Sequence, residues 1–438
     1  MNEITTSNYA TWFRDSTPYI SAHRGRTFVV LVGGDALAHD NLDHIVHDLA
    51  LLHVLGVRVV LVHGARPQID TALSRCEFHA GRRVTDPADM PQILGVCGQL
   101  RSQLEALFST GLPTSPLHNA DIALVSGNFV VARPIGVLDG VDHLLTGKIR
   151  RVHTQRIRTA LESGALVLLS PLGYSPSGQA FNLAADELAA DVAVALSADK
   201  LIVFDGDGYA RDSQGAPLTE LSPTAADSLL DSGEHDATTH AHLQAMVRAT
   251  RGGVTRSHLV SYAQDGALLG ELFTARGQGT QISETHSDLI RHATADDLAG
   301  IVALIRPLED SGVLVRRSRD RLETEIEQFL VAEIDGIVVG CCAVYPFEDS
   351  AELACVAVHA SYRNHDEELG LGSHLLEAAQ RVAENQGVTR LFVLTTQTRD
   401  WFVEKGFQET DTSALPGPKQ ALYNYQRNAK VLVKTLGG

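Results

Sequence analysis

The chain has 438 residues, of which 44% are hydrophobic and 20% charged, and its formal net charge is −17. This length predicts two or three domains rather than one core, and the acidic balance argues against a general role in binding nucleic acid or an anionic membrane surface. No apolar run reaches the roughly 18 residues of a membrane-spanning helix, and the N-terminus lacks a signal-peptide pattern, so we expect a cytoplasmic protein.

The first predicted element is a helix over residues 8–20, which places Tyr9, Trp12 and Phe13 on one face. An aromatic face of this kind packs either on the chain's own domain or against another subunit. The sequence leaves both uses open.

Up to residue 280, short β-branched runs alternate with helical segments, which predicts a mostly parallel sheet with crossover helices. The polar stretch 280–288 shows little apolar periodicity and is predicted to be a linker or a domain edge. We therefore expect an N-terminal helix at 1–22, an α/β domain at 23–284 and a second domain at 288–438. Within the α/β domain, strands are predicted at 28–32, 58–62, 122–125, 166–169 and 201–204, and helices at 42–55 and 187–197.

Two glycine-containing turns carry the first functional signal. Residues 27–37 predict an apolar strand that leads through Gly33 and Gly34 into a helix, a layout that offers backbone N–H groups to phosphate. The segment resembles the opening of an amino-acid kinase domain. That family carries a phosphate-binding lysine at the position of Leu31, and further glycines at Ala65 and Arg66. The resemblance therefore implies a kinase-like fold that has lost its phosphoryl-transfer chemistry.

Two further segments, 81–86 and 181–187, resemble the remaining signatures of N-acetylglutamate kinases. The resemblance implies that Arg83 binds a substrate carboxylate and that Asn182 and Asp186 organise the transfer site. Without the lysine at position 31, the transition state lacks a charge stabilisation of several kcal/mol.

Residues 270–280 resemble the effector-binding segment of arginine-inhibited members of that family. The resemblance implies that Glu271 faces the guanidinium group of L-arginine, while the backbone at Gly277 takes the α-carboxylate or the amine. Arginine-sensitive members also carry an N-terminal helix that links subunits into a hexamer. The alternative for Glu271 is that it merely ends a strand.

The last third of the chain has the pattern of a small α+β domain. Residues 353–358 predict an apolar strand, and residues 362–376 turn from it into a helix through Gly370 and Gly372. This resembles the acetyl-CoA signature of the GNAT acetyltransferases, in which amides at a helix N-terminus meet the pyrophosphate. The departure from the family is an acidic insert at 365–368, which would repel a pyrophosphate unless it points outward. The resemblance assigns CoA contacts to Val356, Ala357, Val358, Arg363, Leu369, Gly370, Leu371, Gly372 and Ser373.

Residues 391–407 and 422–432 also resemble N-acetylglutamate synthases, which fuse an amino-acid kinase domain to a GNAT domain, so the resemblance spans nearly the whole chain. It implies an acetyl-CoA:L-glutamate N-acetyltransferase without a metal, which catalyses the first step of arginine biosynthesis and is inhibited by L-arginine.

Acetylation requires a base, because the α-amine of glutamate is protonated near neutral pH. Glu352, just before the 353–358 strand, matches the family's catalytic glutamate, and an exposed strand-end residue is the alternative. A backbone N–H near Val356 is expected to polarise the thioester carbonyl from a strand bulge. Thr395 is the candidate that protonates the leaving thiolate, with Tyr423 as the second choice.

Two carboxylates on the substrate call for arginines that bind them in a bidentate manner. Arg316 and Arg427 match the family's glutamate-binding arginines, with Leu314 and Cys355 beside them, and Arg317 or Arg319 is able to replace Arg316 after a one-residue shift. Transfer is expected to be direct, because no cysteine occupies the place of an acetyl carrier.

Three alternatives stay open at this point. The first is a bifunctional synthase and kinase, against which Leu31 counts. The second is an arginine-sensing binding protein whose acetyltransferase half has decayed. The third keeps the enzyme and replaces glutamate by another acceptor such as aspartate.

Overall fold

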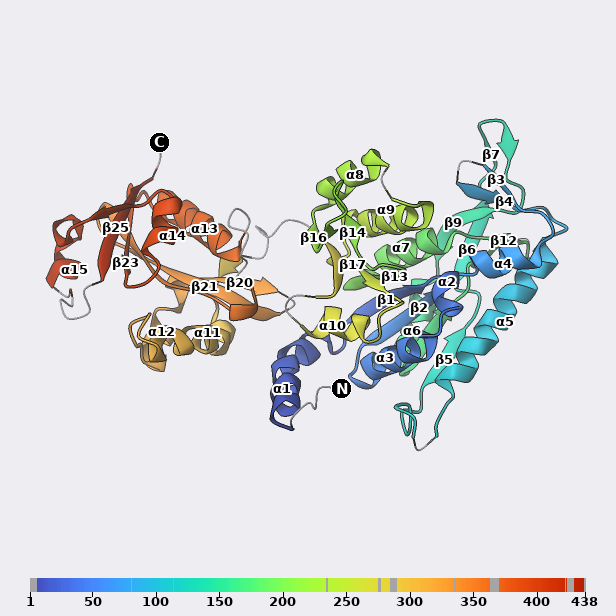
Figure 1. Cartoon of the computed structure of the whole chain (residues 1–438), viewed down its shortest axis with the longest axis horizontal. Helices are drawn as coiled ribbons and strands as arrows, with labels where there is room; N and C mark the ends of the chain where they lie inside the picture. The colour runs from blue at the N-terminus through green and yellow to red at the C-terminus, as the bar shows by residue number, and fades with distance from the viewer. Residues whose placement is uncertain are drawn as a thin grey trace. The chain divides into compact units, whose positions relative to one another are not determined.

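The computed structural model describes residues 6–79, 81–112, 114–233, 235–274, 277–283, 290–334, 336–362, 370–421, 423 and 429–436. Its contacts divide the chain into two compact units, Met1–Glu284 and Thr285–Gly438 (Figure 1). Within the described ranges, no helix is both long and apolar enough to cross a membrane.

The first unit is built on a mixed sheet that is almost entirely parallel. Among the neighbouring strand pairs that the structure describes, only β17 (Arg256–Ser261) and β18 (Gly279–Ser283) run antiparallel. The strands in the middle of the sheet consist mainly of buried apolar residues, as expected where helices cover both faces. The prediction of a mostly parallel α/β fold is therefore confirmed. The described strands of this sheet are, in spatial order, β16 (Glu220–Leu221), β18 (Gly279–Ser283), β17 (Arg256–Ser261), β13 (Lys200–Asp205), β1 (Thr27–Val32), β2 (Arg58–His63), β10 (Ala165–Leu169) and β5 (Ala123–Ser126).

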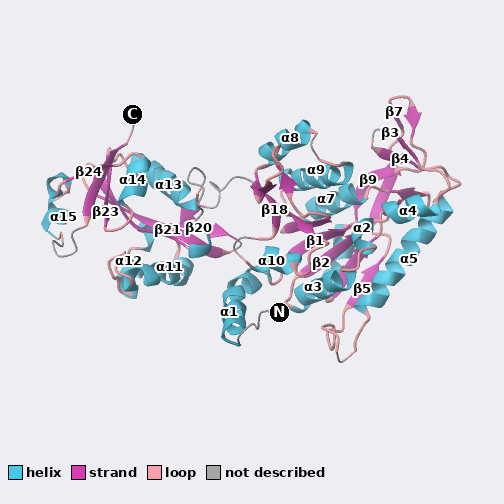
Figure 2. Ribbon diagram, viewed as in Figure 1, coloured by secondary structure: helices cyan, strands magenta, loops and turns pink. Residues whose placement is uncertain are grey.

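Two helical layers enclose this sheet (Figure 2). Odd-numbered residues of β1, such as Val29 and Leu31, pack with α6 (Thr154–Glu162), α7 (Ala185–Leu196), α8 (Pro223–Ser232) and α9 (Ala237–Arg251). Even-numbered residues such as Phe28 and Val30 pack on the other face with α2 (Gly34–Leu37), α3 (Leu42–Val54), α4 (Arg66–Ala72), α5 (Met90–Phe108) and α10 (Ala267–Phe273). The period-two alternation of the strand thus places one core on each side.

The N-terminal helix α1 (Thr6–His23) is attached to α10. The Nε2 atom of His23 lies 2.9 Å from the carbonyl oxygen of Leu272. The His23 ring packs edge-on against Phe28 and Phe273. Of the predicted aromatic face, Phe13 is 52% exposed, whereas the side chains of Tyr9 and Trp12 lie outside the described part.

Smaller strands complete the first unit. A second sheet has the order β12 (Ala180–Asn182), β11 (Leu172–Tyr174), β6 (Val130–Pro134) and β9 (Gly147–Val152). Three hairpins pair β3 (Glu77–His79) with β4 (Arg82–Val84), β7 (Val137–Leu138) with β8 (Val141–Asp142), and β14 (Ala210–Arg211) with β15 (Pro217–Leu218).

The linker alternative for 280–288 is wrong over its first residues, because 280–283 belong to β18 inside the main sheet. Ile282 is fully buried, and the hydroxyl of Thr280, also buried, accepts the backbone N–H of Ala210 at 2.8 Å. Polar residues here are satisfied by hydrogen bonds within the fold rather than by water, so their polarity misled the prediction. Residues 284–288 lie outside the described part.

The second unit is a sheet with helices on both faces. Its described strands are, in spatial order, β19 (Ile290–His292), β20 (Phe329–Ile334), β21 (Ile337–Pro346), β22 (Ser350–Val358), β23 (Arg390–Thr395), β25 (Lys430–Thr435) and β24 (Gln408–Thr410). One face packs on α13 (Leu371–Asn385) and α14 (Arg399–Glu404). The other carries α11 (Leu298–Asp310) and α12 (Arg319–Thr324), and a smaller cluster beside α15 (Gly417–Ala421). The predicted α+β fold is confirmed in this unit.

Asp48 on α3 leads to a prediction about stability and pH. Burial raises the pKa of this carboxyl to about 7, with Asp265 acting in the same direction and His44 opposing it. Because the folded state binds this proton more tightly than the unfolded chain, stability falls as pH rises through the interval between about 4 and 7. We expect Asp48→Asn to raise the urea midpoint at about pH 8 and to change it far less at about pH 5. An equal change at both pH values would contradict this assignment.

Candidate active site

The two parallel strands β22 and β23 separate in the middle of the second unit. Their pairing runs from Ser350–Arg390 to Glu352–Phe392, although β22 continues to Val358 and β23 to Thr395, all within the described residues. Beyond Glu352 the facing edges of the two strands no longer bond to each other. Backbone groups on these edges are therefore able to meet a bound molecule.

A bulge in β22 lies directly after this point of separation. Ala354 pairs with Ala343 and Ala357 with Cys341, so β22 holds one more residue than β21 in this interval. Cys355 adopts a left-handed φ of +53° to accommodate it. A bulge re-aims backbone groups, and this one lies next to Val356, whose N–H the sequence nominated to polarise the thioester carbonyl.

Glu352 lies inside β22 and not before the strand, with Tyr345 and Phe392 as its neighbours across the sheet. It is only 6% exposed, so the alternative of an exposed strand-end glutamate does not describe it. The ammonium group of Lys419 on α15 forms an ion pair with its carboxylate. A buried carboxylate held by an ammonium group suits a residue that takes a proton from an amine.

The groups on the α11 and α12 side of Glu352 are held in fixed protonation states. The hydroxyl of Tyr345 donates to Glu325 at 2.7 Å. Burial raises the pKa of the Cys355 thiol to about 11, and the charge of Arg317 opposes this only in part. A thiol that stays protonated at neutral pH is a poor nucleophile, which agrees with direct transfer.

The expected cofactor turn opens helix α13. Gly370 is its N-cap, and its carbonyl oxygen accepts the backbone N–H of Ser373 at 2.8 Å. A Cβ on Gly372 would lie 3.4 Å from the Trp401 ring and 4.0 Å from Val358, so the helix N-terminus meets the end of β22. Leu371 is buried in the core beneath α13, and the side chain of Ser373 is also buried. Val356 packs on the α13 face and Ala357 on the opposite one. Arg363 and Leu369 lie outside the described residues.

The two candidate proton donors differ in their partners. Thr395, at the end of β23, has its hydroxyl 2.8 Å from that of Thr398 and accepts the backbone N–H of Thr398 at 3.0 Å. Tyr423 instead donates its hydroxyl to the carbonyl oxygen of Ala429 at 2.6 Å. Of the two, only Thr395 lies on one of the strands that separate, namely β23.

The arginines predicted to bind substrate lie after α11. Arg316 is exposed, whereas Arg317 is half-buried and its charge acts on the Cys355 thiol. The Nη1 of Arg317 donates to Val315 at 3.2 Å, and its backbone N–H donates to Glu309 at 2.9 Å. Leu314 packs on the same cluster as Cys355. The second predicted arginine, Arg427, lies outside the described part of the chain.

In the first unit, the two turns that resemble the phosphate-binding turns of amino-acid kinases are filled by side chains of the chain itself. Leu31 is fully buried in the core. The second turn packs directly on the first, since Gln68 donates to the carbonyl oxygen of Gly34 at 2.6 Å and a Cβ on Gly34 would lie 2.5 Å from Pro67. This close packing leaves little room at Gly34 for a phosphate.

The residues that match kinase substrate contacts are likewise engaged within the chain. Arg83 forms an ion pair with Asp70. Asn182 donates to Thr85 at 3.2 Å. Asp186 lies 3.5 Å from Nε2 of the buried His242.

The predicted effector residues lie together at α10. Glu271 is 9% exposed; one carboxylate oxygen lies 2.7 Å from His258 Nδ1 and the other accepts the backbone N–H of Gln278 at 2.6 Å. Burial disfavours the ionised form, but these hydrogen bonds outweigh it and hold the pKa of Glu271 below its usual range. Lys200 Nζ lies 3.4 Å from the other ring nitrogen of His258.

Gly277 contacts this carboxylate from the other side. It has a left-handed φ of +65°, and a Cβ there would overlap the carboxylate of Glu271. The alternative that Glu271 ends a strand is wrong, because it lies within α10.

Both units match known families. Residues 26–261 match the amino acid kinase family and residues 325–409 match the acetyltransferase (GNAT) domain. The chain is 47% identical to the amino-acid acetyltransferases of Ectopseudomonas mendocina and Azotobacter vinelandii, in each case over 98% of this chain and 100% of the relative. The chain belongs to the amino-acid acetyltransferase family.

Solved structures of an N-acetylglutamate synthase agree with this assignment. The synthase of Neisseria gonorrhoeae, complexed with coenzyme A and L-arginine, is 37% identical and has a TM-score of 0.84, with 98% of this chain and 100% of that chain covered. The same enzyme with coenzyme A and N-acetyl-glutamate gives a TM-score of 0.63 at the same identity and coverage.

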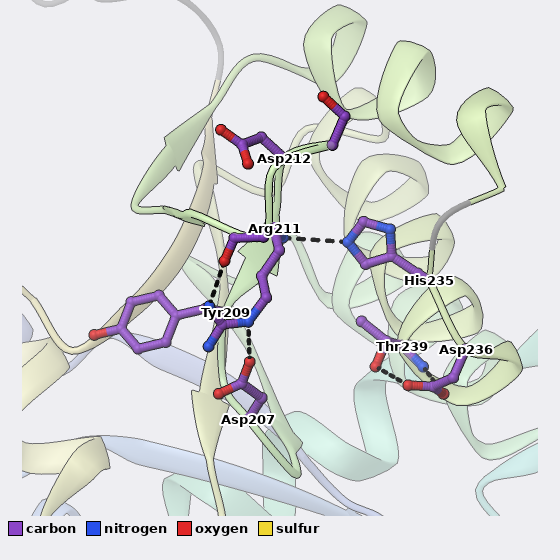
Figure 3. Close-up of a pocket in the computed structure, with 9 residues that line it drawn as sticks. Asp207, Tyr209, Arg211, Asp212, His235, Asp236 and Thr239 are labelled. Carbon is purple, nitrogen blue, oxygen red and sulfur yellow. Dashed lines mark hydrogen bonds and ion pairs between the residues drawn. The ribbon is translucent and has the colours of Figure 1, made fainter.

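This acetyltransferase also has a pocket of about 480 Å³ in its kinase-like unit, between the β14–β15 hairpin and the start of α9 (Figure 3). Its acidic groups have partners within the chain: Asp207 pairs with Arg211 at 2.6 Å, and Asp236 caps α9 through the backbone N–H groups of Thr238 and Thr239. Tyr209 points away from His235 and Thr239 in this view. The pKa of its hydroxyl is raised by burial and by the charge of Glu271.

Sequence reasoning missed several neighbours of the acetyltransferase's predicted residues. Lys419 reaches Glu352 from a short helix far along the chain, and Lys200 and His258 approach Glu271 from two other strands. Of these missed neighbours, Tyr345 could have been identified from the sequence, because the turn between β21 and β22 places it opposite Glu352.

Proposed function

We propose that the chain transfers the acetyl group of acetyl-CoA directly to the α-amino group of L-glutamate. The observation that carries this proposal is the buried Glu352 carboxylate, held by an ammonium group at the point where β22 and β23 separate. The Neisseria synthase, which binds coenzyme A and N-acetyl-glutamate, supports this donor and acceptor.

The chemistry follows from the residues around that point. Glu352 takes a proton from the substrate ammonium, and the neutral amine attacks the thioester carbon. A backbone N–H at the bulge beside Val356 stabilises the developing oxyanion. Thr395, linked to the Thr398 hydroxyl, supports protonation of the leaving thiolate better than Tyr423, whose proton is directed to a backbone carbonyl. The α13 N-terminus at Gly370 and Gly372 is proposed to receive the pyrophosphate.

For the substrate carboxylates we propose Arg316 and Arg427, with Arg317 as an inward-facing cation beside Cys355. Two carboxylates bound by guanidinium groups favour a dicarboxylic acceptor over a neutral amino acid. Glutamate and aspartate differ only by one methylene group, so the choice between these two acceptors depends on the spacing between the guanidinium groups that bind their carboxylates.

We also propose that L-arginine inhibits the enzyme by binding at Glu271 and Gly277, as supported by the arginine complex of the Neisseria synthase. The contact of His23 with Leu272 places α1 against the same helix as Glu271, which supports a coupling between effector and subunit contacts. The assembly that we propose is a cytoplasmic homohexamer joined through α1.

The test is release of free thiol from acetyl-CoA, with glutamate, aspartate or no acceptor, in the presence and absence of arginine. Release that depends on glutamate, exceeds that with aspartate and falls with arginine is expected. Absence of release with any amino acid would reject the enzyme in favour of an arginine-sensing protein, and phosphorylation of N-acetylglutamate from ATP would revive the bifunctional alternative.

A further inference from the structure

The ion pair between Lys419 and Glu352 has a consequence for how the acceptor enters. Both groups are shielded, since the side chain of Glu352 is 8% exposed and that of Lys419 is 26% exposed. Lys419 is carried by α15, just after Leu415, which packs with Phe392, the neighbour of Glu352 on β23. The packing of this segment thus delivers an ammonium group to the carboxylate.

Among the described residues near Glu352, the other charged or titratable groups act on different partners. Tyr345 on β21 directs its hydroxyl to Glu325, and Cys355 on β22 keeps its proton because burial raises the pKa of its thiol. The charge of Arg317 acts on Cys355. A buried carboxylate that loses its counter-ion is strongly destabilised, so the ion pair with Lys419 stabilises the buried position of Glu352.

The proposed reaction requires a second ammonium group at the same carboxylate, namely that of glutamate before it loses its proton. A carboxylate buried to this extent has little room for both. We propose that Lys419 is a positioning residue that holds the place of the acceptor's ammonium group and is displaced when glutamate binds. This inference rests on the proposed function.

The proton balance is unchanged by this exchange. Lys419 leaves with its three protons, and Glu352 then takes one proton from the glutamate ammonium. The C–N bond forms as the C–S bond breaks; the nitrogen gives up its second proton, which balances the proton gained by the thiolate to give free CoA, and the third proton stays on the amide nitrogen. The net reaction releases one proton to solvent.

Displacement is testable without turnover by amine-selective labelling of lysines, read by peptide mass spectrometry, in the complex with CoA that lacks the acetyl group. L-Glutamate is expected to raise the labelling rate of Lys419 about tenfold, because its amine is released from the shielded ion pair with Glu352. Glutarate, which has both carboxylates but no amine, should leave it unchanged. Lys430, paired with Glu409 at 3.0 Å, is the matched control and should not respond to either.

Two variants separate this role from a merely structural one. Glu352→Gln should expose Lys419 to the label without any ligand. Lys419→Met should lower KM for glutamate and change kcat less, because no resident ammonium group then competes with that of glutamate; Lys419→Arg should restore the KM of the unaltered protein.

Calorimetry of glutamate binding distinguishes a failure of this inference from a failure of the proposed function. Glutamate that binds without changing the labelling of Lys419, or glutarate that acts equally, overturns the displacement of Lys419 and leaves the proposed function standing. Glutamate that does not bind at all contradicts the proposed function and this inference together.

Discussion

Glu352→Gln is expected to lower kcat for glutamate acetylation by about a thousandfold, within the range of general base catalysis. The amide has nearly the same shape but accepts no proton from the substrate ammonium. Because Glu352 lies at the last paired position before β22 and β23 separate and not at the helix N-terminus of α13, affinity for CoA should change little. Thiol release gives the first quantity and calorimetry with CoA the second.

Glu409→Gln is the matched control for this variant. Glu409 also pairs with a lysine and belongs to the same sheet, but it lies on β24, and its partners Arg399 and Lys430 lie on α14 and β25. Strands β24 and β25 lie on the far side of β23 from β22. Its activity should stay within about twofold of the unaltered protein, as is usual for a surface ion pair. Equal losses in both variants would show that Glu352 acts through stability and not as a base.

What the sequence could predict was the part of the molecule that local pattern determines. The strand at 353–358 followed by Gly370 and Gly372 identified a helix N-terminus at the end of a strand, and the structure shows Gly372 beside Val358. A pattern of this kind needs only neighbouring residues, because glycines permit close approach wherever the chain turns.

The contacts that escaped prediction link positions far apart in the chain. Lys419 and Glu352 lie on elements separated by α13, β23, α14 and β24, and no periodicity signals such a pair. The helical position of Glu271 was missed for a different reason. Helix α10 has seven residues and starts after Gly266 in a left-handed conformation, so it is too short to show a helical period.

The strand β18 was missed for a third reason, which is that its polar residues are buried or half-buried and form hydrogen bonds within the fold. Thr280 and Ser283 read as solvent-exposed when polarity is taken as a sign of exposure. In the fold, the first of these has a backbone N–H as partner and both pair with β17. Sequence polarity predicts exposure only where no internal partner exists, and that depends on the tertiary structure.

Gly277→Ala is expected to weaken arginine inhibition by about 10- to 100-fold, the value of one hydrogen bond to a charged group. Its Cβ would overlap the carboxylate of Glu271, which has to turn away from the guanidinium position that we propose. Activity without arginine should stay close to that of the unaltered protein, because the change lies in the kinase-like unit. The measurement is the arginine concentration that halves thiol release.

Gly266→Ala separates this effect from backbone strain. Gly266 also has a left-handed φ, of +73°, but a Cβ there would meet nothing within 4 Å. Both alanines should reduce the free energy of unfolding by about 1–2 kcal/mol, and only that at position 277 should change the response to arginine. If both variants lose inhibition equally, then strain around α10 is responsible and the contact between Gly277 and Glu271 is not part of the effector site.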